Sequence, residues 1–483
     1  MDVARLEKAF APQYFRYWNS EEQFRIDEDI ERNRKADLTI SVPDVKPGMR
    51  IHAVLKRHEF IFGCHIFNFN QLGSHEINEK HQSLYGTLFN SATTAFYWQC
   101  FEPEQGKMRF ETTERDTEEY WNRHPDPQFD AFWRRPSTDQ IVDFCEAKKI
   151  RCHGHPLVWS STLWHYPRWL MEKMPKSILV QFLTDLRCGA NIWHQGPEVF
   201  DRLCPEFIGY FMEALENRFR ALSERYGSRI ASWDVCNESA ADYLHGFTAP
   251  GKKITFPCQL CAMPGDYTFQ AFELAEKYFP ACVKKNINDY AVEQHYADQI
   301  TELLERGAKI DIAGQQMHRF ELEKCLNIAN GVTDDLSPEN VRTTIGRLEK
   351  TGLPIHLSEI TITAPNNDER GQAIQALMTR NLYRLWFSLK PMMGITWWNP
   401  VDECGAPKEP AVSGICTRNM EPKPAYHVLN DLINHEWKTD VELAADGKGK
   451  IAFRGFPGTY QLSWKAENGC VRVEEVQAER STT

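Results

Sequence analysis

Short apolar or β-branched runs alternate with longer amphipathic stretches between Phe60 and Trp398, and this alternation constrains the fold more than any other feature of the chain. Each run is long enough for one buried strand, and each is followed by a segment with the 3.6-residue period of a helix. Repeated strand–helix units favour a parallel sheet with helices on its outer side. Eight runs fit this description: 60–67, 88–98, 150–159, 230–237, 283–289, 310–318, 355–361 and 393–398. The pattern predicts an α/β fold, an eight-stranded parallel (β/α) TIM barrel with functional groups at the carboxyl ends of its strands.

The two chain ends lie outside this alternation. Residues 37–59 form a strand, turn and strand pattern, and short alternating runs separated by turn residues follow His435. Because an isolated hairpin is only marginally stable in water, we expect both ends to pair into one small accessory β-sandwich on the barrel. The predicted division is an N-terminal helical segment (1–36), accessory strands (37–59), the barrel (60–435) and further accessory strands (436–483).

Composition narrows the class of protein and of partner. The 483 residues are 42% hydrophobic and 25% charged, as in ordinary soluble proteins. A formal net charge of −11 and the lack of a long basic cluster argue against a nucleic-acid partner. No apolar run approaches the roughly 18–20 residues that cross a membrane. Scattered cysteines and the absence of a signal-peptide pattern indicate a cytoplasmic protein, with secretion open if a signal peptide was removed; the oligomeric state stays unknown.

Two glutamates stand at the ends of strand-like runs. Glu238 follows the run that ends at Asn237, and Glu359 lies within the run 355–361. Buried carboxylates are costly unless they have a function, although structural ion pairs also occur at strand ends. The ends of the fourth and seventh barrel strands meet at one face. Paired carboxylates at that face predict hydrolysis of a glycosidic bond.

Metal chemistry is the main alternative to this interpretation. His153 and His155 lie two residues apart on one strand face, as a metal-binding pair would, and Cys258 and Cys261 form a single C-x-x-C motif. No second cysteine pair and no further set of carboxylate and histidine ligands completes either site in the sequence. We therefore predict no metal and no cofactor, and a metal-dependent hydrolase remains the competing hypothesis.

Seven motifs show that residues from about Phe60 to Leu429 resemble glycoside hydrolase family 10, the family known for endo-β-1,4-xylanases. They occur in the family's order: HGHPLVW at 153–159, WDVCNE at 233–238, NDY at 288–290, GQQMH at 314–318, LSEI at 357–360, GITWW at 394–398 and PKPAY at 422–426. The resemblance implies a retaining mechanism with Glu359 as nucleophile and Glu238 as general acid and then base.

The same resemblance implies the substrate-binding residues. Asn237 would bind the 2-hydroxyl of the sugar at the cleavage point, while Gln316 and His318 would contact the nucleophile. The full implied set is His155, Trp159, Asn237, Gln316, His318 and Trp398. His155 and Trp159 would line the sugar, and Trp398 would form its floor. Trp159 and Trp398 could instead be core residues.

The sequence also departs from the family pattern at three places. Residues 94–103 lack the polar clamp expected on the distal sugars, with Tyr97 and Trp98 among their replacements. Thr361 stands where an aspartate usually orients the histidine. The insertion 109–135 carries six aromatic residues, including Trp121 and Trp133, and we expect it to form a wall of the cleft rather than a solvated loop.

The expected function is hydrolysis of internal β-1,4 linkages in xylan or xylo-oligosaccharides, with a polysaccharide or oligosaccharide as the only partner. Two alternatives stay open: the same retaining chemistry on another β-linked glycan, and a barrel that binds glycans without catalysis.

Overall fold

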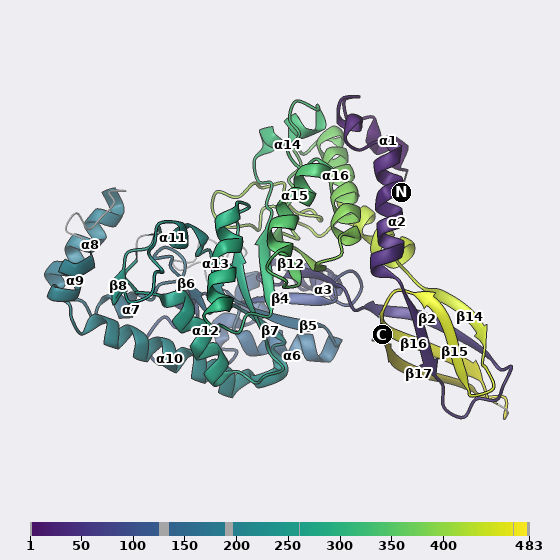
Figure 1. Cartoon of the computed structure of the whole chain (residues 1–483), viewed down its shortest axis with the longest axis horizontal. Helices are drawn as coiled ribbons and strands as arrows, with labels where there is room; N and C mark the ends of the chain where they lie inside the picture. Colours follow the sequence, from purple (N-terminus) through teal and green to yellow (C-terminus); the bar gives the residue numbers. More distant parts are fainter. Residues whose placement is uncertain (1, 125–134, 189–196, 260, 467, 481–483) are drawn as a thin grey trace.

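The computed structural model describes residues 2–124, 135–188, 197–259, 261–466 and 468–480. A closed barrel surrounded by helices forms the larger part, and sheets built from both chain ends project from it as a smaller lobe (Figure 1). Across the described residues, no helix is both long and apolar enough to cross a membrane.

All eight expected strands are present and parallel. They follow each other around the barrel in chain order, and pairing of β7 with β10 completes the circuit. The barrel strands are β3 (Ile61–His65), β4 (Ser91–Ala95), β5 (Arg151–His155), β7 (Ser232–Asn237), β10 (Lys284–Asp289), β11 (Ile312–Gln316), β12 (Ile355–Ile360) and β13 (Met392–Trp397). The predicted (β/α) TIM barrel is confirmed.

These strands are buried on both faces, which explains their nearly continuous apolar sequences. All six residues of β12 are buried, since one face points into the barrel and the other packs against helices. Gly154 on β5 marks a close approach: a Cβ atom there would lie 2.2 Å from the ring of Trp233 on β7. A glycine is therefore required where these strands pack.

A helix covers each strand from outside. The covering helices are α3 (His75–Ser83), α6 (Thr138–Lys148), α10 (Phe207–Tyr226), α12 (Tyr267–Tyr278), α13 (Gln294–Glu305), α15 (Pro338–Glu349), α16 (Glu369–Ser388) and α17 (Pro424–Asp431). Further helices and strands occupy the connections: α4 (Trp98–Phe101), α5 (Glu118–Asn122), β6 (Val158–Trp159), α7 (Arg168–Met171), α8 (Lys176–Cys188), α9 (Pro197–Leu203), α11 (Ala240–Leu244), β8 (Ile254–Thr255), β9 (Met263–Pro264) and α14 (Leu322–Ala329).

The two chain ends pair with each other, as expected. One sheet joins β1 (Ala36–Ser41) to β15 (Lys450–Gly455), and a second has the order β14 (Asp440–Ala444), β2 (Arg50–His58), β16 (Gly458–Lys465) and β17 (Val471–Ala478). We call these six strands the accessory sheets. Alternating burial along β16 follows the side-chain period of a strand with one covered face.

The N-terminal segment connects this lobe to the barrel. It contains α1 (Val3–Glu7) and α2 (Ser20–Arg34), and α2 packs along α16 (Figure 1). Asn19 caps α2 by accepting a hydrogen bond from the backbone nitrogen of Glu22 at 2.9 Å. Arg384 on α16 forms an ion pair with Asp27 on α2 at 2.5 Å.

Candidate active site

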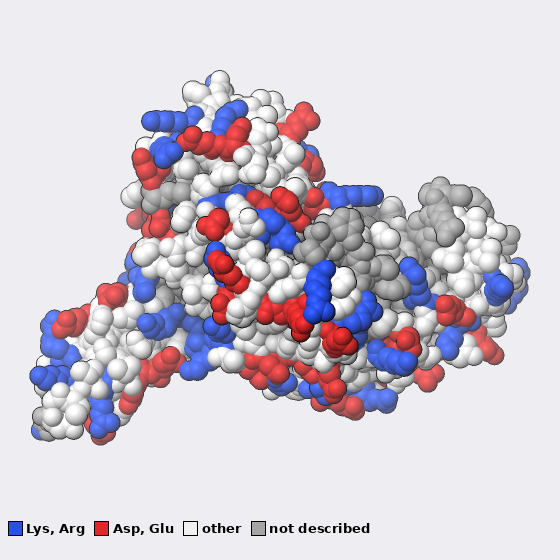
Figure 2. Space-filling model, turned by 180° about the vertical axis from the view of Figure 1, so that it is seen from behind, with Lys and Arg blue, Asp and Glu red and all other residues white. Residues whose placement is uncertain are grey.

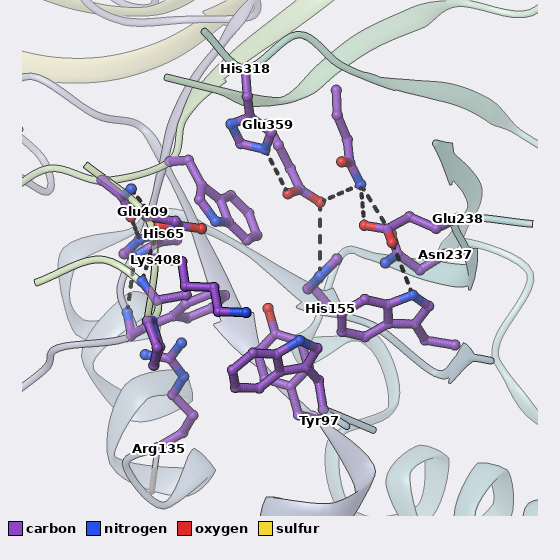
Figure 3. Close-up of a pocket in the computed structure, with 18 of the residues that line it drawn as sticks. His65, Tyr97, Arg135, His155, Asn237, Glu238, His318, Glu359, Lys408 and Glu409 are labelled. Atoms are coloured by element: carbon purple, nitrogen blue, oxygen red, sulfur yellow. Dashed lines mark hydrogen bonds and ion pairs between the residues drawn. The ribbon is translucent and has the colours of Figure 1, made fainter. Parts of the chain in front are cut away.

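A cavity of about 320 Å³ opens at the carboxyl ends of the barrel strands. Its walls come from the ends of β3, β5, β7, β11 and β12 and from the loops that follow barrel strands, including β4 and β13 (Figure 3). The structure brings every sequence-predicted site residue into this cavity: His155, Trp159, Asn237, Glu238, Gln316, His318, Glu359 and Trp398.

Glu238 and Glu359 face each other across one amide group. Gln316 Nε2 lies 3.2 Å from Glu238 Oε1 and 3.1 Å from Glu359 Oε1 (Figure 3). One nitrogen in hydrogen-bond contact with both carboxylates requires them to be close together. This proximity matches a pair of carboxyl groups that flank and act on one bond of a substrate.

Glu238 sits on a strained turn that directs its side chain into the cavity. Its φ angle is 55°, which is uncommon for a residue with a side chain. The end of β10 holds this turn, because Glu238 N donates to Asn288 O at 2.8 Å and Ala240 N donates to Asp289 Oδ2 at 2.8 Å. Burial raises the pKa of Asp289 to about 7.

Two further donors reach the other oxygen of Glu238. Trp159 Nε1 donates to Oε2 at 3.1 Å, and Gln259 Nε2 donates to the same atom at 3.0 Å. With Gln316, three nitrogen groups contact this carboxyl. Gln259 belongs to the connection between β8 and β9, and no sequence signal pointed to it.

Glu359 is buried, with an exposed fraction of 5%. Burial raises the pKa of Glu359 to about 8, His155 opposes this rise, and the charge of Glu238 adds to it. Asn288 Nδ2 donates to Oε1 at 2.8 Å, and His318 Nε2 lies 3.2 Å from Oε2. Ionisation of Glu359 is therefore costly and depends on the donors around it.

A buried aspartate fixes the histidines of β5. Asp234 Oδ2 lies 3.0 Å from His153 Nε2 and 2.7 Å from His155 Nδ1. Burial alone would raise the pKa of Asp234, but the charges and hydrogen bonds of the two histidines hold it below its usual value. The other nitrogen of His155 lies 3.8 Å from Glu359 Oε1, so Asp234 orients His155 toward the carboxylate.

These contacts bear on the metal hypothesis. His153 uses its second nitrogen to contact Ser232 Oγ at 2.8 Å, and Cys261 Sγ donates to Ser160 O at 2.7 Å. Over the described ranges, no three His, Cys, Asp or Glu side chains are arranged to hold a metal ion. Hydrogen bonds within the fold therefore account for the His153–His155 pair.

His318 contacts both Glu359 and Thr361. Its Nδ1 lies 3.1 Å from Thr361 Oγ1, so the hydroxyl occupies the position where the family pattern has a carboxylate. Burial lowers the pKa of His318 to about 4, although the charges of Glu409 and Glu238 raise it. The imidazole is therefore neutral at pH 7.

Asn237 and Trp398 complete the inner part of the cavity. Asn237 Oδ1 accepts a hydrogen bond from Asn288 Nδ2 at 2.9 Å. Ser358 Oγ donates a hydrogen bond to Asn288 Oδ1. Asn288 was not among the predicted site residues, although the NDY motif contains it. The Trp398 ring meets His155 edge-on with centroids 5.4 Å apart, and it lines the same cavity as the two carboxylates.

The opposite side of the cavity is charged, which sequence analysis missed. The buried guanidinium of Arg135 lies over the rings of Phe67 and Tyr97, at 4.7 and 5.8 Å from their centroids. Lys408 extends toward the middle of the cavity in Figure 3. Glu409 Oε2 accepts from Asn399 Nδ2 at 2.7 Å. Only Tyr97 had a sequence signal, because it lies where the family's polar clamp is missing.

The described part of the insertion 109–135 contributes less to the cavity than expected. Trp121 is 1% exposed and does not line it, so the prediction that Trp121 walls the cleft is wrong. Trp121 is instead the buried residue of the short helix α5, whose start is capped by Thr117. Arg135, at the end of the insertion, does reach the cavity. Trp133 lies outside the described residues.

Residues 53–432 match the sequence profile described as glycosyl hydrolase family 10. The chain belongs to this family. The match covers the whole barrel and begins inside β2 of the accessory sheets. The family resemblance seen in the seven motifs is thereby confirmed.

Two curated relatives are distant in sequence and longer than this chain. The anti-sigma-I factor RsgI6 of Acetivibrio thermocellus is 22% identical over 450 residues, which cover 92% of this chain and 46% of that protein. Endo-1,4-beta-xylanase A of Thermoanaerobacterium saccharolyticum is 24% identical over 305 residues, covering 61% of this chain and 22% of that protein. The chain thus spans less than half the length of either relative.

Solved structures share the barrel. Native xylanase 10B of Thermotoga maritima superposes with a TM-score of 0.54 at 19% identity, covering 78% of this chain and 96% of that one. Xylanase 10B of Thermotoga petrophila RKU-1, solved in complex with xylobiose, gives a TM-score of 0.54 at 18% identity, with 78% and 95% covered. At this identity the similarity concerns the fold.

Proposed function

We propose that this family 10 member is a retaining glycoside hydrolase that cleaves internal β-1,4 linkages of xylan or xylo-oligosaccharides. The observation that carries the proposal is the contact of Gln316 Nε2 with both Glu238 and Glu359. Retaining enzymes need carboxyl groups about 5–5.5 Å apart, whereas inverting enzymes separate them by about 6.5–9.5 Å to admit a water. Two carboxylates that share one donor favour the retaining arrangement.

In the first step, Glu359 attacks the anomeric carbon of the sugar and forms a glycosyl ester. The bond between that carbon and the bridging oxygen breaks, and Glu238 gives its proton to the departing oxygen. Asn288 and His318 hold the attacking carboxylate in place. Glu359 attacks only when ionised, so these contacts favour its reactive form.

In the second step, water replaces the departed sugar. Glu238, now a carboxylate, takes a proton from this water as its oxygen attacks the anomeric carbon and releases Glu359. The hydrogen bonds from Trp159 and Gln259 stabilise the carboxylate form of Glu238 between the two steps. The sugar leaves with the configuration it had in the substrate.

The remaining cavity residues suit an uncharged sugar next to the cleaved bond. Trp159 and Trp398 offer apolar ring surface to the C–H faces of a sugar ring. Asn237 keeps its amide nitrogen for a substrate hydroxyl, because its oxygen already accepts from Asn288. We assign it to the 2-hydroxyl, where hydrogen bonds strengthen in the transition state.

A second candidate is the same chemistry on a different β-linked glycan. The charged side of the cavity, with Arg135, Lys408 and Glu409, favours it because these groups replace the family's usual clamp on distal sugars. Initial rates on xylan, arabinoxylan, β-glucan and mannan would decide. A preference for xylan over the others by tenfold or more supports the first candidate, and a reversed ranking supports the second.

The roles of the glutamates can be tested by azide rescue. In Glu359→Gly, external azide should restore cleavage of an aryl β-xyloside and yield the α-glycosyl azide. In Glu238→Ala, activity on good leaving groups should persist and azide should yield the β-glycosyl azide. If the two variants gave the opposite azide products, Glu238 would be the nucleophile and Glu359 the acid and base. Inactivity of the unmodified protein on every aryl glycoside and glycan would instead support a barrel that only binds glycans.

A further inference from the structure

A second cavity, of about 490 Å³, lies on the face of the barrel opposite the candidate active site. Its walls come from the end of α2, the segment between β2 and β3, the beginning of β5, the turn between α16 and β13, and the connection between β15 and β16. The cavity therefore sits where the barrel's strands begin and the accessory sheets meet it. Neither proposed catalytic residue reaches it.

The lining of this cavity is strongly basic. Among the described residues, five cations and a single carboxylate, Glu59, line it, in a chain whose net charge is −11. The cations are Arg32, Arg34, Arg151, Lys390 and Arg480. Figure 2 shows Lys and Arg side chains gathered where the accessory sheets join the barrel. A neighbouring cavity of about 210 Å³ shares Glu59 and Arg151 and adds Arg57 and Lys149.

Two of these cations are held by the fold itself. Arg34 donates to the carbonyl oxygens of Phe387, Leu389 and Met392, the last at 2.8 Å. Burial, helped by the positive charge of Arg480 and opposed by the negative charge of Glu59, lowers the pKa of Arg34 to about 9. Arg480 donates to Asn33 O. Packing two guanidinium groups together costs energy unless an anion lies near them.

Two others are available to a ligand. Arg151 and Lys390 are exposed, and within the described part of the chain neither forms an ion pair. Glu59, the only acid in the lining, likewise has no cation within ion-pair distance there. Low-dielectric walls around charges of one sign strengthen the attraction of the opposite charge. Phe60, Phe387 and Phe456 supply such walls.

We propose that this cavity binds a small phosphorylated molecule, with its phosphate between Arg151, Lys390 and the buried arginines. Guanidinium groups match phosphate oxygens in paired hydrogen bonds, and a phosphate group carries a charge of about −1.5 to −2 at pH 7. Four positive charges in excess of Glu59 favour a phosphate over a single carboxylate. The volume suits a ligand of metabolite size, and the phenylalanines would contact its uncharged part.

Calorimetric titration of the full chain with pyrophosphate, at constant ionic strength, tests the proposal. Saturable binding is expected, and the double variant Arg151→Ala/Lys390→Ala should bind at least tenfold more weakly. The control Lys253→Ala/Lys324→Ala removes two charges at exposed positions elsewhere and should leave the affinity unchanged. Glucose 6-phosphate and ATP, titrated in parallel, distinguish a sugar phosphate from a nucleotide as the ligand.

A second variant, which should bind pyrophosphate more tightly, shows whether misfolding explains the weaker binding of the double variant. Glu59→Gln removes the only carboxylate of the lining, so pyrophosphate affinity should rise severalfold, which a damaged fold would not produce. Xylanase rates of all variants should match the unmodified protein, because none of these residues lines the active site. No saturable binding, an equal loss in the control pair, or an unchanged affinity of Glu59→Gln would overturn the proposal.

Discussion

The chemistry of the proposed site depends on Glu359, a buried carboxyl group whose ionisation destabilises the folded protein. Its carboxylate lies deep in the barrel, and burial raises its pKa to about 8. Neighbouring donors from Asn288, Gln316 and His318 offset part of that cost without removing it. Groups that serve catalysis often reduce stability in this way.

Replacement of Glu359 by Gln should therefore stabilise the protein, and more so at high pH. The folded pKa of about 8 exceeds the ordinary glutamate value of 4.5, so the stability that protonated Glu359 contributes is full below pH 4.5 and is lost as pH rises through 8. We expect the variant to raise Tm by roughly 3 °C or more at pH 8 and by less than about 1 °C at pH 4.

Calorimetry at both pH values checks this, with the exposed Glu119→Gln as the matched control. An equal change in Tm at pH 4 and pH 8 would show that Glu359 titrates normally in the folded protein.

Thr361 offers a second prediction at single-residue scale. Thr361→Asp places a carboxylate against His318 Nδ1, which should raise the pKa of His318 from about 4 and move the pH–rate profile. The Thr361→Asn variant has a similar size and no charge, so it should leave that pKa nearly unchanged. NMR titration of the imidazole carbons measures both. If the aspartate variant titrates like the unmodified protein, another group already orients the imidazole.

Among the structural elements, the segment between β4 and α6 departs most from its sequence interpretation. The aromatic residues of its insertion 109–135 suggested a sugar-binding wall, yet Trp121 faces the interior, and of the insertion's described residues only Arg135 reaches the active-site cavity. Arg109 and Asp116 form an ion pair inside this segment, and the Asp116 side chain is fully buried. The described part of the insertion is thus held by its own core.

Removal of the Trp121 ring should act on stability rather than on substrate affinity. Trp121→Ala leaves a large cavity and should cost about 3–5 kcal/mol. Trp121→Phe keeps most of the ring and also removes an indole nitrogen that has no hydrogen-bond partner among the described residues, so it should cost much less. Chemical denaturation measures both values. A higher KM on xylan with unchanged stability would instead show that Trp121 contacts the substrate in the cleft.

Across the whole molecule, the barrel and the accessory sheets are joined through α2. Arg34 at the end of this helix donates to three backbone carbonyls around the turn between α16 and β13, and its guanidinium lies 5.1 Å from the centroid of Phe60. Because the accessory sheets contain strands from both chain ends, neither end can leave without breaking the pairing of β2 with β16. We expect the two parts to unfold together.

Arg34→Ala should test this coupling. The variant leaves buried carbonyl groups without donors, which should cost about 2–4 kcal/mol and lower the temperature of a single unfolding transition. Arg32→Ala on the same helix is the control, because the Arg32–Asp29 pair is largely exposed on the arginine side and should contribute less than about 1 kcal/mol. Two separate transitions in the calorimeter would show that the parts unfold independently.

Sequence alone was sufficient for the barrel and for the pairing of the chain ends. Strand and helix periods are local properties, because a strand buried on both faces needs a continuous apolar run and its covering helix needs one apolar stripe. Motifs such as WDVCNE and LSEI lie on these regular elements. The barrel geometry therefore brings Glu238 and Glu359 to one face whatever the loops do.

Only the tertiary structure decided what surrounds those carboxylates. Gln259, Arg135 and Lys408 come from irregular connections far apart in sequence, and their positions depend on how those connections pack. The burial of Trp121 and the basic cavity beneath the barrel have the same origin. Loops lack the regular spacing of apolar residues that marks the buried face of a helix or strand, so the sequence does not show which of their aromatic and charged side chains are buried. Their environment is determined by contacts between distant segments, which exist only once the chain has folded.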